Sequence, residues 1–355
     1  MATDLTEAAS RPAPISDSLS GGTLPRWAPL GCIAGSLLLA YLLAVFTAVS
    51  GTAGTLLVAA VLYAVIQSGW SFSVEGRRHA KDRLATTLIY SSFVVAFIPL
   101  VAVLTTVVIK GLKALNPIFL THSMRNIDLA LPGGGVYHAI IGTIEQVGLA
   151  AVLGIPVGVM VAIYLVEYGA RGLLARAISF FVDVMTGVPS IVAGLFVYTG
   201  FVLTLGYERS GVAGSLALAI LMIPVVVRST EEMLKLVATD LRESSYALGV
   251  PKYRTILRIV IPTALGGIIT GALLAVARVA GETAPLLLTT FLSQSINTNP
   301  FTGPQASIPV FIWDQIASGT DASIDRAWAG AMTLILLIMV LNIVARLVAR
   351  LTRVK

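Results

Sequence analysis

The sequence predicts an all-α protein that crosses a membrane about eight times. Of its 355 residues, 56% are hydrophobic and only 12% are charged, and the mean hydropathy is +0.89. Soluble domains carry about 25% charged residues, so this composition is typical of an integral membrane protein. The length of the chain therefore limits how many membrane-spanning helices it can form, since each needs roughly 20 apolar residues.

Eight apolar segments are long enough to span the bilayer. The first two are separated by a very short turn around Ser50 and Gly51, which makes them a hairpin. Several later segments exceed a minimal span, so we expect them to be tilted or interrupted. The segments lie at about 29–48, 51–70, 85–109, 138–166, 176–205, 211–228, 256–288 and 327–348.

The first 28 residues are rich in Ser, Pro and Gly and poor in apolar surface, so we expect a flexible tail. The tail is too long, and too acidic near its start, for the basic region of a secretory signal. The apolar run after it is therefore predicted to be an uncleaved helix. Cys32 is the only cysteine, which excludes an intrachain disulfide, and we interpret it as a small buried side chain.

Lys and Arg residues are unequally distributed between the two sides of the predicted helices. Eighteen lie on one side, five on the other, and Arg278 lies inside a span. Cytoplasmic loops carry the excess of positive charge, so both termini are predicted to be cytoplasmic. The net charge of +6 thus reflects membrane topology, and no nucleic-acid partner is expected.

Two predicted external segments, 110–137 and 289–326, are long enough to have structure. The second contains no Lys or Arg before Arg326 and includes several aspartates among Pro, Asn and Ser. Long segments of this kind are functional or disordered. Residues 289–326 are therefore either a loop that contacts a partner or a solvated connector.

The cytoplasmic stretch 239–251 carries the signals of a short helix outside the membrane. Asp240 is placed to cap this helix, and Glu243, three residues later, can reach back to the N–H of the capping residue. Gly249 suits a left-handed stop, and Pro251 suits the start of the next helix.

One face of that short helix is predicted to be shared by Leu241, Ser245 and Leu248, at positions i, i+4 and i+7. A helix with such a face is shaped to dock in the groove of another subunit. A capped loop helix without any partner is the alternative.

The same stretch resembles a family signature. Glu243-Ser244-Ser245, three residues, Gly249, nine residues, and then Ile259-Val260-Ile261-Pro262 is similar to the E-A-A-x3-G-x9-I-x-L-P run of ABC importer permeases. The two serines and one isoleucine that depart from it are small exchanges. The resemblance implies a coupling helix that fits a cleft on an ATPase subunit. Its coupling residues would be Asp240, Glu243, Ser244, Ser245, Leu248 and Gly249.

A second run narrows the family. Residues 277–286, which read A-R-V-A-G-E-T-A-P-L, resemble the R-A-x-G-E-T-A-P-L run of phosphate importer permeases, in the form typical of the A-type subunit. Weaker similarities lie at 133–143 and 187–196. The resemblance covers about residues 85–355 and implies a six-helix core of the type I ABC importer. Residues 29–84, an N-terminal hairpin and basic loop, are additional to it.

The resemblance implies a permease subunit that forms half of the path of an ATP-driven inorganic phosphate importer in a prokaryotic cell membrane. The chain has no G-x-x-x-x-G-K-[ST] loop, so it is not expected to bind a cofactor or to be an enzyme, and ATP and Mg would lie on partners. Those partners would be a C-type permease subunit, two ATPase subunits and an external phosphate-binding protein.

Other classes of function remain as alternatives. A permease for sulfate, molybdate or phosphonate is the nearest, followed by a secondary transporter or channel. A membrane enzyme is disfavoured because neither H-E-x-x-H nor G-x-S-x-G occurs. His79, His122 and His138 lack metal-ligand spacing, so structural or solvated roles are expected for them.

Charged residues inside predicted spans are the candidates for the substrate path. A charge near the bilayer centre costs about 2.5 to 3.5 kcal/mol. Arg278 and Glu282 are four residues apart, so a continuous helix would place them on one face in the outer half of the membrane. The guanidinium suits phosphate oxygens. Glu282 would neutralise it or accept a hydrogen bond from the proton that phosphate retains, and a structural ion pair is the alternative.

Four further residues complete the candidate path. Thr283 belongs to the same run as Glu282, and Arg228 ends a predicted span just before two glutamates. Glu145 and Asp183 each lie within a predicted span. Packing or interfacial roles are the alternative for Glu145 and Asp183, and a role as a positive-inside anchor is the alternative for Arg228.

Overall fold

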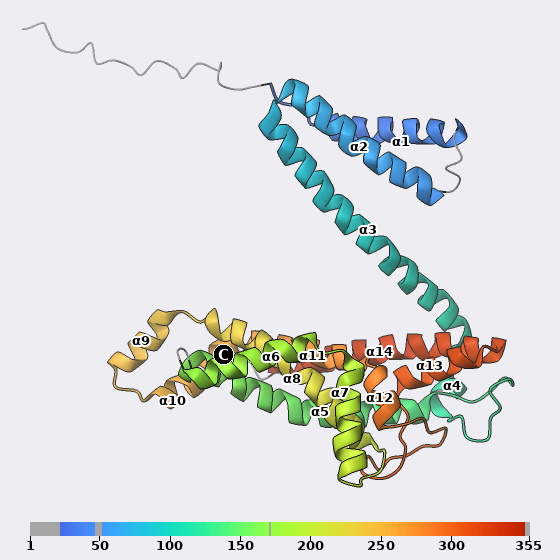
Figure 1. Ribbon diagram of the computed structural model, residues 1–355, viewed down its shortest axis with the longest axis vertical. Helices are drawn as coiled ribbons and strands as arrows, with labels where there is room; N and C mark the ends of the chain where they lie inside the picture. The colour runs from blue at the N-terminus through green and yellow to red at the C-terminus, as the bar shows by residue number, and fades with distance from the viewer. Residues whose placement is uncertain (1–21, 47–51, 170–171, 352–355) are drawn as a thin grey trace, which may run out of the picture. The chain divides into compact units, whose positions relative to one another are not determined.

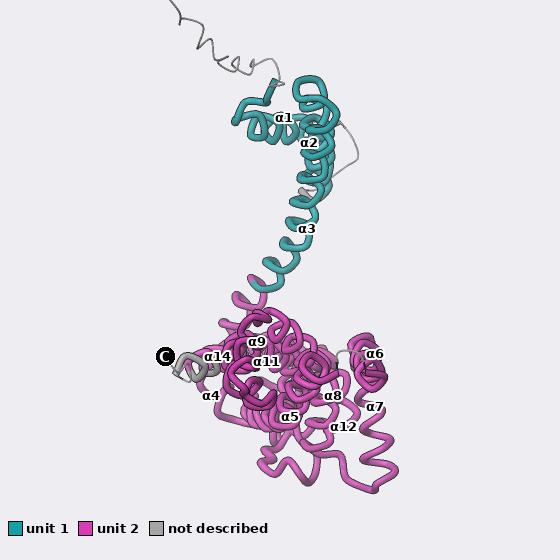
Figure 2. The backbone as a smooth tube through the Cα atoms, turned by 90° about the vertical axis from the view of Figure 1, so that its left-hand side faces the viewer, with its two compact units in different colours: residues 1–104 teal, residues 105–355 magenta. Residues whose placement is uncertain are grey.

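The computed structural model describes residues 22–46, 52–169 and 172–351, and the regular structure among them is entirely helical (Figure 1). The chain divides into two compact units, residues 1–104 and 105–355 (Figure 2). By length and composition, seven of the described helices can cross a membrane, and a bent pair of helices counts as an eighth span if taken together. The prediction of an all-α, polytopic membrane protein is confirmed.

The first unit contains α1 (Ala28–Phe46), α2 (Thr52–Val74) and most of α3 (Arg77–Ala114). Helices α1 and α2 pack as the predicted hairpin, with the rings of Trp27 and Trp70 in a T-shaped contact 5.9 Å apart. The turn predicted at Ser50 and Gly51 and residues 1–21 of the predicted tail lie outside the described residues. Within residues 22–27, Leu24 is buried.

A buried carboxylate joins the parts of this unit. Glu75 lies between α2 and α3 and accepts hydrogen bonds from Arg83 Nε and Nη2 at 2.6 and 2.7 Å. The Ser71 hydroxyl donates to it at 2.6 Å and the backbone N–H of Leu24 at 2.7 Å. The bonds from Arg83 are the largest cause that lowers the pKa of Glu75 from 4.5 to about 2.

We therefore expect Glu75→Gln to destabilise the hairpin. A carboxylate with a lowered pKa contributes stability above its ordinary pKa of 4.5, and this contribution is lost as the pH falls toward 2. The variant should have a lower Tm at pH 7, by an amount that corresponds to about 1–3 kcal/mol, and the difference from the wild type should shrink below pH 4.5. Thermal unfolding followed by tryptophan fluorescence measures both. Asp82→Asn, at an exposed carboxylate, is the control; equal shifts for the two variants would contradict this role of Glu75.

The second unit is a bundle organised around α8. Its helices, in chain order after the end of α3, are α4 (Pro117–Thr121), α5 (Tyr137–Ile163), the π-helical η2 (Tyr164–Tyr168), α6 (Leu173–Gly187), α7 (Ser190–Val197), the π-helical η3 (Tyr198–Thr204), α8 (Gly211–Lys235), α9 (Thr239–Ala247), α10 (Lys252–Thr255), the π-helical η4 (Ile256–Val260), α11 (Ile261–Ala280), α12 (Ala284–Thr289), α13 (Ile308–Ser318) and α14 (Asp321–Leu351).

Helix α8 lies against α5, α6, α7, α11 and α12. Its contact with α5 is close because glycines face it: a Cβ at Gly158 would lie 2.8 Å from the Cβ of Val226. Small residues at such positions let the backbones of membrane helices approach, and the gain in van der Waals packing holds the helices together. Leu218, Met222 and Val226 of α8 are fully buried in this core.

Two of the predicted spans are interrupted. The segment 176–205 is not one straight helix, because α6 and α7 meet at Val188 and Pro189 with a bend of 108°. Pro189 disfavours helical backbone at the residue before it, which explains the position of the break. The segment 256–288 is also too long as predicted, since α11 ends at Ala280 and a separate helix, α12, begins at Ala284.

The predicted external segment 289–326 is largely folded. It contains α13 and the start of α14, and Arg326 lies in α14 with only 5% of its surface exposed. The Arg326 guanidinium donates to Gln315 Oε1 and to the carbonyls of Leu129, Leu131 and Gly133. These bonds fix residues 289–326 to the other long segment, 110–137.

Candidate functional site

A polar cavity of about 160 Å³ lies where the two interrupted spans meet. It is bounded by the α6–α7 break, by the middle of α8 and by the end of α11. Hydroxyl, guanidinium and carboxylate groups contribute to its wall, which is unusual inside a bundle of apolar helices. The lining residues are Met185, Thr186, Val188, Ser190, Leu221, Pro224, Val225, Arg278 and Glu282.

Arg278 and Glu282 both reach this cavity, but they do not share a helix face as predicted. Helix α11 ends between them: the N–H of Gly281 bonds to the Arg278 carbonyl and that of Glu282 to the Val279 carbonyl. Within the described part of the chain, neither side chain has a hydrogen bond or an ion pair. Thr283 follows at the N-cap of α12, and its side chain makes no capping bond.

Close packing of α7 on α12 shapes one wall. A Cβ at Gly194 of α7 would lie 2.6 Å from the Cα of Pro285 in α12, so only glycine allows this approach. Gly194 and Pro285 belong to the runs 187–196 and 277–286, which the sequence showed as separate similarities. The fold brings the two runs together around the cavity.

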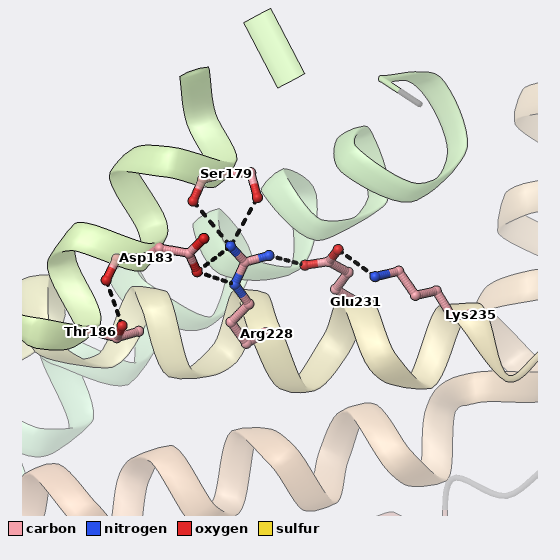
Figure 3. A network of polar contacts seen from close by, with 6 residues as sticks. All are labelled: Ser179, Asp183, Thr186, Arg228, Glu231 and Lys235. Atoms are coloured by element: carbon pink, nitrogen blue, oxygen red, sulfur yellow. Dashed lines mark hydrogen bonds and ion pairs between the residues drawn. The ribbon is translucent and has the colours of Figure 1, made fainter. Parts of the chain in front are cut away.

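Asp183 and Arg228 are joined in a chain of ionic contacts beside the cavity (Figure 3). Arg228 of α8 reaches Asp183 Oδ1 of α6 with Nη2 at 2.5 Å and with Nε at 3.1 Å. The same Nη2 donates to the hydroxyl and carbonyl of Ser179 at 2.9 and 3.0 Å. On the other side, Nη1 lies 2.5 Å from Glu231, which also binds Lys235 at 2.7 Å.

Glu145 does not line this cavity. Its carboxylate accepts a hydrogen bond from the Nε2 of Gln305 at 2.5 Å, and the Nε2 of Gln146 donates to Gln305 Oε1 at 3.1 Å. A Cβ at Gly142 would lie 2.0 Å from the carbonyl oxygen of Ala306, so this part of α5 is shaped to receive residues 305–306. In the described structure, Glu145 holds the segment before α13 against α5.

The short helix predicted at 239–251 exists as α9, but its predicted cap is wrong. Ala238 occupies the N-cap and no side chain caps the helix. Asp240 instead lies in the first turn, where its negative charge is favourable to the helix dipole. The predicted left-handed stop is confirmed, because Gly249 has φ +73°.

The three residues of the predicted common face of α9 differ in exposure. Ser245 is buried and its hydroxyl lies 2.8 Å from that of Thr255 in α10, whereas Leu241 and Leu248 are 45% and 83% exposed. Glu243 and Ser244 are exposed as well. Helix α9 therefore turns Ser245 toward its own unit and presents two leucines outward.

A buried ion pair that the sequence did not reveal anchors this loop. Arg242 of α9 binds Glu167 of η2 at 2.9 Å and donates to the carbonyls of Leu234 and Val237. Lys252 donates to the Glu167 carbonyl. No local pattern predicts this pair, because 75 residues separate its members. In the sequence, Arg242 contributed only to the excess of positive charge in the cytoplasmic loops.

The anchor leads to a stability prediction. Glu167→Ala should lower the Tm of the chain, by an amount that corresponds to about 3 kcal/mol, since it leaves a buried guanidinium without its carboxylate. The apolar double variant Glu167→Met, Arg242→Leu should recover most of that loss. Differential scanning fluorimetry in detergent measures both. Glu243→Gln, at an exposed carboxylate of the same helix, is the control; an equal loss there would refute the anchor.

A polar cavity inside a bundle of membrane-spanning helices, with an anchored helix presented outside the bundle, fits a transmembrane transport subunit. Residues 154–354 match the family described as "Binding-protein-dependent transport system inner membrane component", and the chain belongs to this family. The family of the predicted resemblance is thereby confirmed.

Two kinds of relative are similar to this chain. The "Phosphate transport system permease protein PstA 1" of Mycobacterium tuberculosis strain H37Rv is 50% identical over 77% of this chain and 88% of its own length. The "Phosphate transport system permease protein PstA" of Yersinia pestis is 41% identical over 76% and 90%. A solved bacterial ABC transporter involved in the import of the acidic polysaccharide alginate matches with a TM-score of 0.52 at 15% identity, over 78% of this chain and 99% of that chain. That likeness establishes the fold alone.

Proposed function

We propose that this chain is the A-type permease subunit of an ATP-driven importer of inorganic phosphate and forms half of its translocation path. The observation that carries the proposal is the cavity in which Arg278 and Glu282 lie without partners among the described residues. Charged groups at membrane depth are costly, and those that persist without a structural partner have a substrate as their natural partner. The relatives named as phosphate transport permeases supply the identity of that substrate.

The chemistry of the cavity suits a phosphate ion. The planar Arg278 guanidinium can donate two parallel hydrogen bonds to phosphate oxygens and keeps its charge when water is removed. Ser190 lies in the same wall, and its hydroxyl can donate to one of the remaining oxygens. Glu282 would accept a hydrogen bond from the proton that phosphate retains near neutral pH. Sulfate has no such proton, so Glu282 would discriminate against it.

The remaining parts of the transporter would lie on other chains. We infer that α9 docks in a cleft of an ATPase subunit, with two ATPase subunits holding ATP and Mg. A C-type permease subunit would complete the path, and an external phosphate-binding protein would deliver the ion. The bias of Lys and Arg supports cytoplasmic termini in a prokaryotic cell membrane.

Exchange of the two charged cavity residues tests the substrate. Arg278→Lys should lower phosphate uptake by at least tenfold, because a point charge replaces the bidentate fork. Glu282→Gln should lower uptake and weaken selectivity against sulfate, because a neutral amide replaces the charged acceptor. Uptake of phosphate and of sulfate into proteoliposomes, per assembled complex, measures both effects.

A structural role for the two residues predicts a different result. If the two residues only stabilised the subunit, the double variant Arg278→Leu, Glu282→Met would recover the stability and the transport that the single variants lose. Near-normal phosphate uptake by this folded double variant would refute the substrate contact. Faster uptake of sulfate than of phosphate by the wild type would instead favour a permease for another oxyanion.

The coupling loop gives an independent test. Gly249→Pro should abolish ATP-dependent uptake without preventing membrane insertion, because proline cannot adopt the left-handed φ of +73°. Glu243→Arg should do the same by reversing the charge of the exposed face of α9. Normal uptake with normal ATPase stimulation in both variants would show that α9 does not couple. A secondary transporter would give that result.

A further inference from the structure

Asp183 is unusually exposed for a carboxylate in a membrane segment. Its side chain is 65% exposed, although it lies in α6 and is bonded to Arg228. A carboxylate that faced lipid would be very unfavourable, so such residues face a water-filled path or a neighbouring subunit. Asp183 therefore marks a side of α6 that lipid does not cover.

Asp183 and Arg228 each lie three residues along their helix from a residue that lines the Arg278 cavity. In α6, Thr186 lines the cavity and its hydroxyl donates to the Asp183 carbonyl at 2.6 Å. In α8, Val225 lines the cavity, and Arg228 follows three residues later, a rise of about 4.5 Å. Helix α8 continues from Arg228 toward α9, so the pair lies on the α9 side of the cavity.

The two carboxylates that bind Arg228, those of Glu231 and Asp183, differ in exposure and in their other partners. Glu231 is 13% exposed and binds a second cation, Lys235. Asp183 binds no second cation among the described residues, its side chain is 65% exposed, and both bonds from Arg228 reach its Oδ1 alone (Figure 3). An oxyanion that replaced Asp183 on Nε and Nη2 would keep the charge and the hydrogen bonds of the guanidinium.

We propose that Arg228 is a second oxyanion site, on the α9 side of the Arg278 cavity, and that Asp183 is the counter-ion that phosphate displaces there. The inference rests on the proposed function, because it takes phosphate as the ion and the α9 side as the exit. Phosphate that leaves Arg278 of α11 meets the Arg228 guanidinium of α8 next, and the return of Asp183 to Arg228 then releases the ion. Phosphate already present on the exit side competes with Asp183 for the same site and inhibits transport.

The test measures this inhibition in the complete transporter in proteoliposomes. ATP-driven phosphate uptake is followed at increasing concentrations of inorganic phosphate on the ATPase side. Asp183→Asn removes the competing charge, so the half-inhibitory concentration should fall about tenfold. Arg228→Lys loses the two-donor fork and should raise it about tenfold. Glu231→Gln is the matched control, since it removes a carboxylate from the same guanidinium on its buried side, and it should leave the half-inhibitory concentration unchanged.

The outcomes separate a transport role from a structural one. If Asp183→Asn and Glu231→Gln both keep the wild-type value, or shift it equally, Asp183 is only a structural partner and the inference is overturned. If Asp183→Asn does not assemble, Asp183→Ser must show the same tenfold fall, and a wild-type value there overturns the inference. Absence of phosphate transport by the wild type would overturn the proposed function itself.

Discussion

The obligation to satisfy backbone hydrogen bonds inside lipid governs this structure. Helices satisfy them internally, so interruptions are tolerated only where other protein segments surround them. Both interruptions in the second unit, at Val188–Pro189 and after Ala280, lie against α8 and against each other through α7 and α12. The cavity exists because the two breaks lie next to each other. They expose helix ends and polar side chains at a depth in the membrane where continuous helices would present only apolar side chains.

Small residues make that coincidence possible. Gly158 lets α8 approach α5, Gly194 lets α12 approach α7, and Gly142 accepts the segment before α13. At each close contact, atoms of a neighbouring segment occupy the space that a side chain would otherwise fill. The result is a rigid frame around α8, from which the ionic chain of Arg228 and the loop bearing α9 both extend.

The sequence predicted what depends on local pattern and missed what depends on distant partners. The apolar runs located the spans, and Gly249 located the end of α9, because both signals are local. The break after Ala280 was missed because the apolar pattern continues through it to Leu288. The capping role assigned to Asp240 failed because the helix starts earlier, at Thr239. The pairs of Arg242 with Glu167 and of Glu145 with Gln305 join segments 75 and 160 residues apart, which one sequence cannot reveal.

The π-helical segments η2, η3 and η4 bear on how relatives of this chain are aligned. A π-helix has i→i+5 hydrogen bonds, so its turn holds one residue more than a turn of α-helix. Deleting one residue from η4 would therefore restore α-helical geometry and leave residues 252–255 facing as before relative to α11. Deleting one residue from a continuous α-helix would instead rotate everything on one side of it by about 100°. A one-residue gap at η2, η3 or η4 in an alignment can therefore leave distant helix faces in register, whereas the same gap elsewhere in a span would turn them away from the core.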